Sequence, residues 1–173
     1  MNKYDVIIIG AGPSGIFCAY ELMRQKPDMK VLMIEKGRSI EKRQCPKRTT
    51  KVCVGCKPCS ITTGFAGAGA FSDGKLSLSP DVGGTLPEIL GYEKAEELIK
   101  EADNIYLKFG ADEKVYGIDD YEAIERIRAK AIRANLKLIE CPIRHLGTEE
   151  GYKIYTRLQE HLLASGVEIK FMT

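Results

Sequence analysis

No hydrophobic run in this sequence of 173 residues approaches the roughly 18 residues that a membrane-spanning helix requires. The longest apolar run near the N-terminus covers only residues 6–11. That run is also too short and too rich in glycine for a secretory signal, and Asp5 precedes it. The sequence therefore predicts a cytoplasmic protein without a membrane span.

The sequence also lacks an excess of charge of either sign, because 26 Lys and Arg residues face 24 Asp and Glu residues, a formal net charge of +2. A chain so close to neutral has no strong attraction to nucleic acid or to anionic membranes, so neither is expected as the main partner. Internal repeats and low-complexity linkers are absent. With 44% hydrophobic and 29% charged residues, the composition is that of an ordinary globular protein and excludes bulk disorder.

The start of the chain has the pattern of a β-α-β unit. Residues 4–9 are almost continuously apolar, which predicts a strand buried on both faces. The sequence Gly-Ala-Gly-Pro-Ser-Gly follows over residues 10–15, and apolar residues at helical spacing continue to Met23. A second apolar run at 31–34 completes the unit.

The glycine motif lies where a dinucleotide-binding turn needs it, after an apolar strand and at the start of a helix. Gly10 permits a tight turn, Gly12 has no Cβ and lets a diphosphate approach the backbone, and Gly15 lets helix and strand pack closely. The free N–H groups of the first helical turn and the helix dipole would then bind the diphosphate. The alternative is a glycine-rich structural turn without a ligand.

Glu35 stands 20 residues after Gly15, at the end of the second apolar run. A carboxylate at this spacing is typical of one that accepts hydrogen bonds from the adenosine ribose hydroxyls. It would repel a 2′-phosphate, so the pattern favours FAD or NAD over NADP. The motif does not separate FAD from NAD.

The rest of the chain divides by composition into a basic, Cys- and Gly-rich insertion over residues 38–91 and a helical segment with a return to the sheet over 92–173. Periodic apolar residues predict helices over 93–109, from Asp119 or Asp120, and from Thr148, and strands over 136–143 and 167–172. We therefore predict an α/β fold in which a Rossmann-like β-α-β unit over 1–37 opens one incomplete FAD/NAD(P)-binding domain.

Four of the six cysteines lie close together, at Cys45, Cys53, Cys56 and Cys59. Two consecutive C-x2-C spacings let three thiolates converge on one cluster, and the cysteine at 45 can supply a fourth ligand across a short loop. Thiols stay reduced in the cytoplasm, so metal binding is favoured over disulfides. An iron–sulfur cluster is favoured over zinc, whose sites more often pair two separated knuckles. A redox dithiol activated by nearby cations, and a loop without function, are the alternatives.

A second glycine-rich stretch covers residues 64–70 and continues into Ser72 and Lys75. Alternating glycine and alanine would let backbone N–H groups lie against a flat ligand, and either polar side chain could bond to a flavin or a substrate. A structural turn is equally consistent with this pattern. His145 is a candidate acid/base group between a strand and a helix, although such histidines are more often structural. No set of His, Ser and Asp assembles into a catalytic site, so the catalytic residues are unknown.

Four motifs together carry a resemblance. Residues 5–15 with Glu35-Lys36-Gly37 resemble the N-terminus of FAD-dependent oxidoreductases with the glutathione-reductase-type fold. More narrowly, residues 53–59, 67–76 and 144–148 resemble a family of poorly characterised FAD-dependent dehydrogenases.

This resemblance implies FAD as the bound dinucleotide and an oxidoreductase acting on an unknown small-molecule substrate, with NAD(P)H or an electron carrier as reductant. It implies that the second glycine-rich stretch lies near the isoalloxazine ring. Members of such families are much longer, so the chain is expected to be the N-terminal part of such an enzyme. The implied FAD contacts are Gly10, Gly12, Pro13, Ser14, Gly15, Glu35, Lys36 and Arg43.

Two other functions stay open. Proteins similar to thiazole synthases share the opening unit and bind an adenylated nucleotide without flavin redox chemistry, although the cysteine cluster disfavours this function. The second alternative is a non-enzymatic metal-binding or electron-transfer module held by the four clustered cysteines.

Overall fold

A computed structural model describes residues 3–173 of the chain. The chain forms two compact units, one of Met1–Gly74 with Thr148–Thr173 and one of Lys75–Gly147. The three regions expected from the sequence, 1–37, 38–91 and 92–173, were defined by composition and not by compactness. They stay a prediction.

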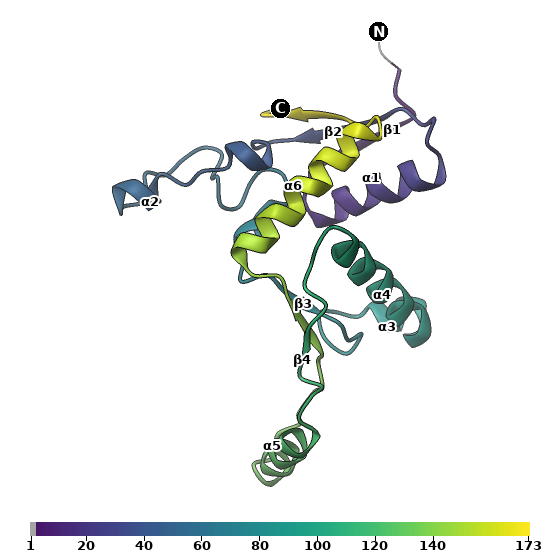
Figure 1. Ribbon diagram of the computed structural model, residues 1–173, viewed down its shortest axis with the longest axis vertical. Coiled ribbons are helices and arrows are strands. Elements are labelled where there is room, and N and C mark those ends of the chain that lie inside the picture. The colour runs from purple at the N-terminus through teal and green to yellow at the C-terminus, as the bar shows by residue number, and fades with distance from the viewer. Residues whose placement is uncertain (1–2) are drawn as a thin grey trace. The chain divides into compact units, whose positions relative to one another are not determined.

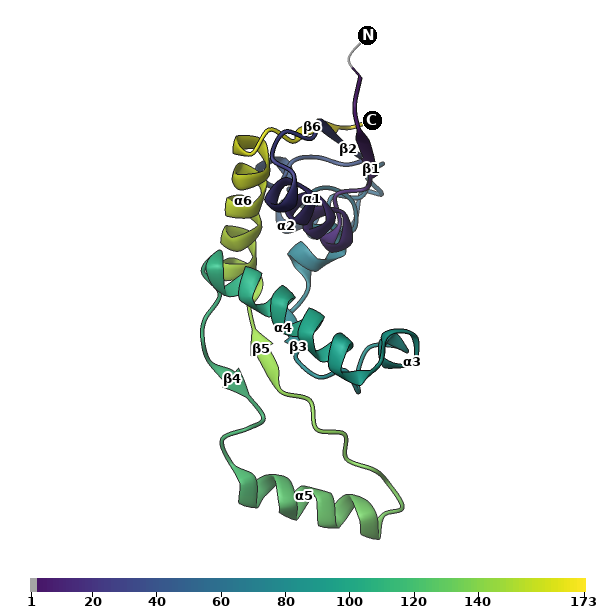
Figure 2. The same cartoon turned by 90° about the vertical axis from the view of Figure 1, so that its right-hand side faces the viewer.

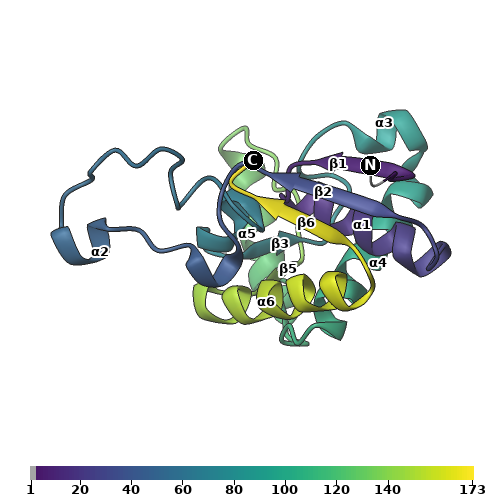
Figure 3. The ribbon, with the colours of Figure 1, turned by 90° about the horizontal axis from the view of Figure 1, so that it is seen from above.

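The first unit is built on a sheet of three parallel strands, β1 (Val6–Ile9), β2 (Val31–Glu35) and β6 (Glu168–Phe171), in the order β1-β2-β6. Figure 3 shows β2 between the other two strands. Helix α1 (Pro13–Gln25) connects β1 to β2. The predicted β-α-β unit and the α/β fold class are confirmed.

Helices α1 and α6 (Thr148–Ala164) lie on the same face of this sheet (Figure 1). Ile8 of β1 is buried toward them, whereas Ile7 and Ile9 alternate to the other face and are 55% and 87% exposed. The expectation of a first strand buried on both faces is therefore wrong, because among the described residues the helices of this unit cover one side only. The fully buried apolar side chains of this unit include Ile16, Met33, Ile40, Phe65, Ile154, Leu158 and Leu162.

Residues 36–74 run as a long segment with three short helical turns, η1 (Ile40–Lys42), α2 (Lys47–Thr50) and η2 (Gly67–Phe71). The part that carries α2 extends away from the sheet (Figure 3), whereas η2 packs against α6.

The second unit contains a small antiparallel sheet of β3 (Lys75–Ser77), β4 (Val115–Tyr116) and β5 (Ile143–His145), in the order β3-β5-β4. Its helices are α3 (Leu86–Leu90), α4 (Tyr92–Lys108) and α5 (Tyr121–Arg133). Figure 2 shows α5 in the long connection between β4 and β5, and no side chain of α5 is buried.

Several sequence expectations for these elements can be compared with the structure. The helix expected over 93–109 is confirmed as α4, and the helix expected from 119 or 120 is confirmed as α5, where the Asp120 carboxylate accepts a hydrogen bond from the Ala123 N–H at 2.8 Å. The strand expected over 136–143 is mostly wrong, because only residue 143 of that range lies in a strand. Residues 136–142 run without strand pairing.

A buried ion pair holds the second unit together. The Arg144 guanidinium donates to both carboxylate oxygens of Asp103, at 2.5 and 2.8 Å, and to the carbonyl of Asp112 at 2.6 Å. The hydrogen bonds to Asp103 raise the pKa of Arg144. One side chain thereby joins β5, α4 and the loop that precedes β4. No helix within residues 3–173 combines the length and the apolar character needed to cross a membrane.

Candidate functional site

The turn between β1 and α1 uses its three glycines for three different reasons. Gly10 has a φ of +95°, a conformation that side chains other than glycine rarely adopt. A Cβ on Gly15 would lie 2.1 Å from the carbonyl oxygen of Gly10, so helix and strand pack too closely for any side chain there. A Cβ on Gly12 would meet nothing within 4 Å. The fold therefore requires the first and third glycines, while the second borders open space that a bound group could fill.

The N-terminus of α1 has the properties of an anion-binding helix end. No side chain caps it, and its first turn contains no acidic residue. Pro13 takes the first helical position, and Ser14 in the same turn is exposed. The unpaired N–H groups and the dipole of this end favour a negatively charged group.

Glu35 ends β2 beside this turn and is only 5% exposed. One carboxylate oxygen accepts a hydrogen bond from the Ala11 N–H at 2.7 Å, and the other accepts one from the Gly37 N–H at 2.7 Å. A carboxylate offers about four acceptor positions, so it can still accept from the hydroxyls of a ribose. The neighbouring Lys36 is exposed. The sequence alone did not predict that Gly37 would bind the Glu35 carboxylate. Its position two residues after that carboxylate could have indicated it.

Arg43, for which the resemblance implied an FAD contact, is buried and binds backbone carbonyls of its own chain; the FAD contact stays a prediction. Its side chain is 4% exposed, and its guanidinium donates to the backbone carbonyls of four residues of the segment 60–67. Burial lowers the pKa of Arg43, while the negative charge of Glu35 acts in the opposite direction. These bonds occupy four of the five N–H groups of the guanidinium. The four acceptors are the carbonyls of Ser60, Ile61, Phe65 and Gly67.

The second glycine-rich stretch lies against the first. The Ala66 N–H donates to the Ala11 carbonyl at 2.7 Å, directly inside the turn between β1 and α1. A Cβ on Gly67 would lie 3.4 Å from the Cα of Gly12, and one on Gly69 would lie 3.8 Å from Pro13. Two glycine-rich segments far apart in sequence therefore form one surface.

A cavity of about 430 Å³ lies beyond the carboxyl ends of β2 and β6, and one of its lining residues, Arg38, follows Glu35 by three positions. Arg38 and Lys42 follow β2, Met172 follows β6, and Lys57 belongs to the extended segment. No carboxylate is among its lining residues. In open α/β sheets, ligands bind at this edge.

The four clustered cysteines do not form a ligand set in the described part of the chain, because no group of three or more His, Cys, Asp or Glu residues is arranged around a common metal position there. Cys45 and Cys56 line the cavity beyond β2 and β6, while Cys53 and Cys59 are exposed. Hydrogen bonds from the backbone of Thr62 and Ile61 lower the pKa of the Cys59 thiol, and Arg43 lowers it further. Metal ligation by these four residues stays a prediction.

His145 lies in the second unit and is exposed at the end of β5. Lys75 of β3 pairs with His145 in the antiparallel sheet. The Tyr116 ring lies edge-on to the imidazole of His145, with 6.3 Å between the two ring centres. The Lys114 ammonium lies 4.7 Å from the centre of the Tyr116 ring. A role of His145 in proton transfer stays a prediction.

Comparisons with known proteins point to the opening unit. A model of the Thi4 family matches residues 1–41. The thiamine thiazole synthase of Coprinopsis cinerea is 52% identical over 33 residues, which are 19% of this chain and 10% of that protein.

One solved structure with a similar fold matches nearly the whole chain. The 3-ketosteroid-Δ4-(5α)-dehydrogenase of Rhodococcus jostii RHA1 is 17% identical with a TM-score of 0.52, over 98% of this chain and 38% of that one. Thermovibrio ammonificans THI4 is 12% identical with a TM-score of 0.40, over 97% of this chain and 38% of that one.

The likeness to the steroid dehydrogenase shows the fold. At the level of the fold, the expected α/β architecture built on a parallel sheet is confirmed. The chain spans 38% of the length of these two structures, and its match spans 10% of the thiazole synthase.

Proposed function

We propose that this chain binds the ADP part of FAD and belongs to a flavin-dependent oxidoreductase. The observation that supports this most is the placement of Glu35. Its buried carboxylate ends β2, and a hydrogen bond joins it to the glycine turn at Ala11. This hydrogen bond would join the ribose acceptor directly to the diphosphate-binding turn.

Each part of the ADP moiety of FAD has a proposed counterpart in the described residues. The diphosphate would lie over Gly12 and accept hydrogen bonds from the N–H groups of Ser14 and Gly15 at the start of α1. The ribose hydroxyls would donate to Glu35, whose charge disfavours a 2′-phosphate. The adenine would enter the cavity beyond β2 and β6, beside Arg38.

When bound, the flavin supplies hydride or electron transfer between a small-molecule substrate and NAD(P)H or an electron carrier. The residues of this chain bind and orient the cofactor at its adenosine end. The open space at Gly12, the uncapped helix end and the buried carboxylate all fit this ligand. Within residues 3–173 the four cysteines do not converge on a common position.

The test is a visible absorption spectrum of freshly purified protein under anaerobic conditions, with iron and zinc measured on the same sample. We expect a flavin band after incubation with FAD and desalting, and a weaker or absent band for Glu35→Gln. A chain that retains no flavin, and whose protein fluorescence is unchanged by FAD, would overturn the proposal. A triple variant with Ser at Cys53, Cys56 and Cys59 tests the metal prediction, because unchanged iron and zinc content would exclude these ligands.

A second candidate is supported by the match of residues 1–41 to the Thi4 family and by the short, highly identical segment shared with a thiamine thiazole synthase. In that case the same site would hold an adenylated nucleotide derived from NAD rather than a redox flavin. Mass spectrometry of material released from the purified protein separates the two. An adenylated compound without flavin favours this candidate, and FAD excludes it.

A further inference from the structure

We propose that Arg43 is a positioning residue for the diphosphate-binding turn, and that it acts through the segment 60–67 rather than by touching the cofactor. This inference rests on the proposed binding of an ADP-containing ligand. It replaces the direct FAD contact that the resemblance implied for this arginine.

The first step of the argument is the guanidinium itself. Its Nε donates to the Ser60 carbonyl at 3.0 Å, and Nη2 donates to the Ile61 carbonyl at 2.6 Å. Its Nη1 donates to the carbonyls of Phe65 and Gly67 at 2.6 and 2.7 Å. With four of five donors committed to backbone oxygens, the side chain cannot also grip a diphosphate in the bidentate manner for which arginine is suited.

The second step is what these bonds hold in place. The segment must bend sharply, since Ala66 has a φ of +70° and Gly67 a φ of +57°. A positive φ is left-handed, and a residue with a side chain, such as Ala66, adopts it only at a cost in free energy. Hydrogen bonds from one buried cation to the carbonyls on both sides of Ala66 stabilise the bend.

The third step connects the bend to the ligand site. The Ala66 N–H donates to the Ala11 carbonyl at 2.7 Å, while the Ala11 N–H donates to Glu35 at 2.7 Å. Ala11 is thus held from both sides, by the end of β2 and by the segment that Arg43 holds. Because Ala11 lies between Gly10 and Gly12, the orientation of the peptides that face the diphosphate depends on both supports.

The packing of the segment allows no simple replacement for the arginine. A Cβ on Gly64 would lie 2.6 Å from Cδ of Arg43, and one on Gly37 would lie 2.4 Å from the backbone nitrogen of Gly64. The centre of the Phe71 ring lies 4.7 Å from the guanidinium carbon, a cation–π contact. A lysine keeps the charge but lacks the planar fork that reaches four carbonyls.

The experiment compares ADP with adenosine as probes for the 173-residue chain and its Arg43→Lys variant, by isothermal titration calorimetry. Both probes carry the ribose that Glu35 would bind, but only ADP carries a diphosphate. We expect the variant to lose about tenfold in affinity for ADP and to stay within about twofold for adenosine. Arg48→Met is the matched control, because it removes an exposed cation that lies 5.9 Å from the same Phe71 ring. We expect it to change neither affinity.

A second measurement does not depend on any ligand. Amide hydrogen exchange of Ala66, which donates to Ala11, should accelerate in Arg43→Lys while the amides of β2 keep their protection. Equal losses for ADP and adenosine would show a general loss of structure and overturn the positioning role. Unchanged ADP affinity would overturn it as well. If the unaltered chain binds neither ADP nor FAD, the proposed function fails first, and the role of Arg43 fails with it.

Discussion

The carboxylate of Glu35 and the backbone N–H of Ala11 are joined by a buried hydrogen bond of 2.7 Å that connects the end of one strand to the turn after another. The two residues are 24 positions apart in the sequence. A hydrogen bond to an ionised acceptor is roughly twice as strong as one between neutral groups. The candidate ribose acceptor therefore also fixes the candidate diphosphate turn.

Replacing Glu35 by Gln should weaken ligand binding more than it weakens the fold. The amide keeps the shape of the side chain but loses the charge, and only one of its two terminal atoms can accept a hydrogen bond from Ala11 or Gly37. We expect a loss of at least about tenfold in FAD affinity, measured by the quenching of flavin fluorescence. Glu149→Gln, at an exposed position in the first turn of α6, is the control and should bind like the unaltered chain.

The glycines at 12 and 15 should separate binding from folding. In Gly15→Ala the new methyl group would meet the Gly10 carbonyl at 2.1 Å, and overpacking of this kind costs about 1–3 kcal/mol in free energy of unfolding. In Gly12→Ala the methyl group meets nothing within 4 Å, and the change in stability should stay within about 1 kcal/mol.

The two variants are measured by urea denaturation and by FAD titration. Gly12→Ala should unfold near the midpoint of the unaltered chain and yet bind FAD at least about tenfold more weakly, because the methyl group occupies the space of the diphosphate. Unchanged FAD affinity in Gly12→Ala would contradict the assignment of that space.

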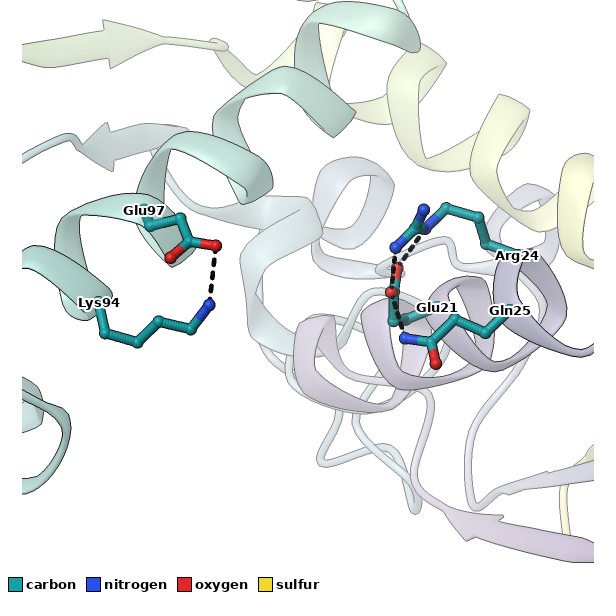
Figure 4. Close-up of polar contacts among 5 residues, drawn as sticks. All are labelled: Glu21, Arg24, Gln25, Lys94 and Glu97. Carbon is teal, nitrogen blue, oxygen red and sulfur yellow. Dashed lines mark hydrogen bonds and ion pairs between the residues drawn. The ribbon is translucent and has the colours of Figure 1, made fainter.

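The pair of Asp103 and Arg144 predicts a large loss of stability from a small change. Asp103→Asn leaves a buried guanidinium without its counter-charge, and breaking a buried pair in this way costs about 3–5 kcal/mol. Glu97→Gln, which removes an exposed pair with Lys94 on the same helix (Figure 4), should cost about 0–1 kcal/mol. Equal shifts of the urea midpoint in the two variants would contradict the structural role of Arg144.

Glu21 on α1 should titrate far below an ordinary glutamate. Hydrogen bonds from Arg24, and then from Gln25, lower its pKa to about 2 (Figure 4). Because the pKa is depressed in the folded state, the resulting stability is present above the ordinary pKa of an unfolded glutamate. It is lost as the pH falls toward 2. Carbon NMR of the carboxyl group measures this directly, and Arg24→Gln should move the midpoint upward. A midpoint at the ordinary value in the unaltered chain would contradict the geometry.

The sequence was sufficient for the parts of the molecule that depend on local patterns. The strand-turn-helix at the start, the carboxylate at the end of β2 and the cap at Asp120 each follow from residues within a few positions of one another. The helices α4 and α6 were also predictable, because their apolar residues repeat at helical spacing over 17 residues each.

Long-range partners were not predictable in the same way. Arg43 binds backbone carbonyls, and because every residue has one, the sequence does not show which of them it binds. Arg144 binds Asp103, which lies 41 positions away in the sequence. The strands β3, β4 and β5 have only two or three residues each, too few to show an alternation. The apolar residues of β1 indicated a buried strand, but they carry no information on how many faces the helices cover.

The open face of β1 has a practical consequence for every titration named above. Ile7 and Ile9 present adjoining aliphatic surface on a strand whose pairing within the described residues is with β2 alone. Surfaces of this kind adhere to one another, to resins and to hydrophobic dyes. We therefore expect apparent affinities to drift with protein concentration, and light scattering followed in parallel would reveal the association that causes it. Ile9→Lys, which places a charge on this face, is the reference variant, because it leaves Gly10, Gly12, Glu35 and Arg43 unaltered.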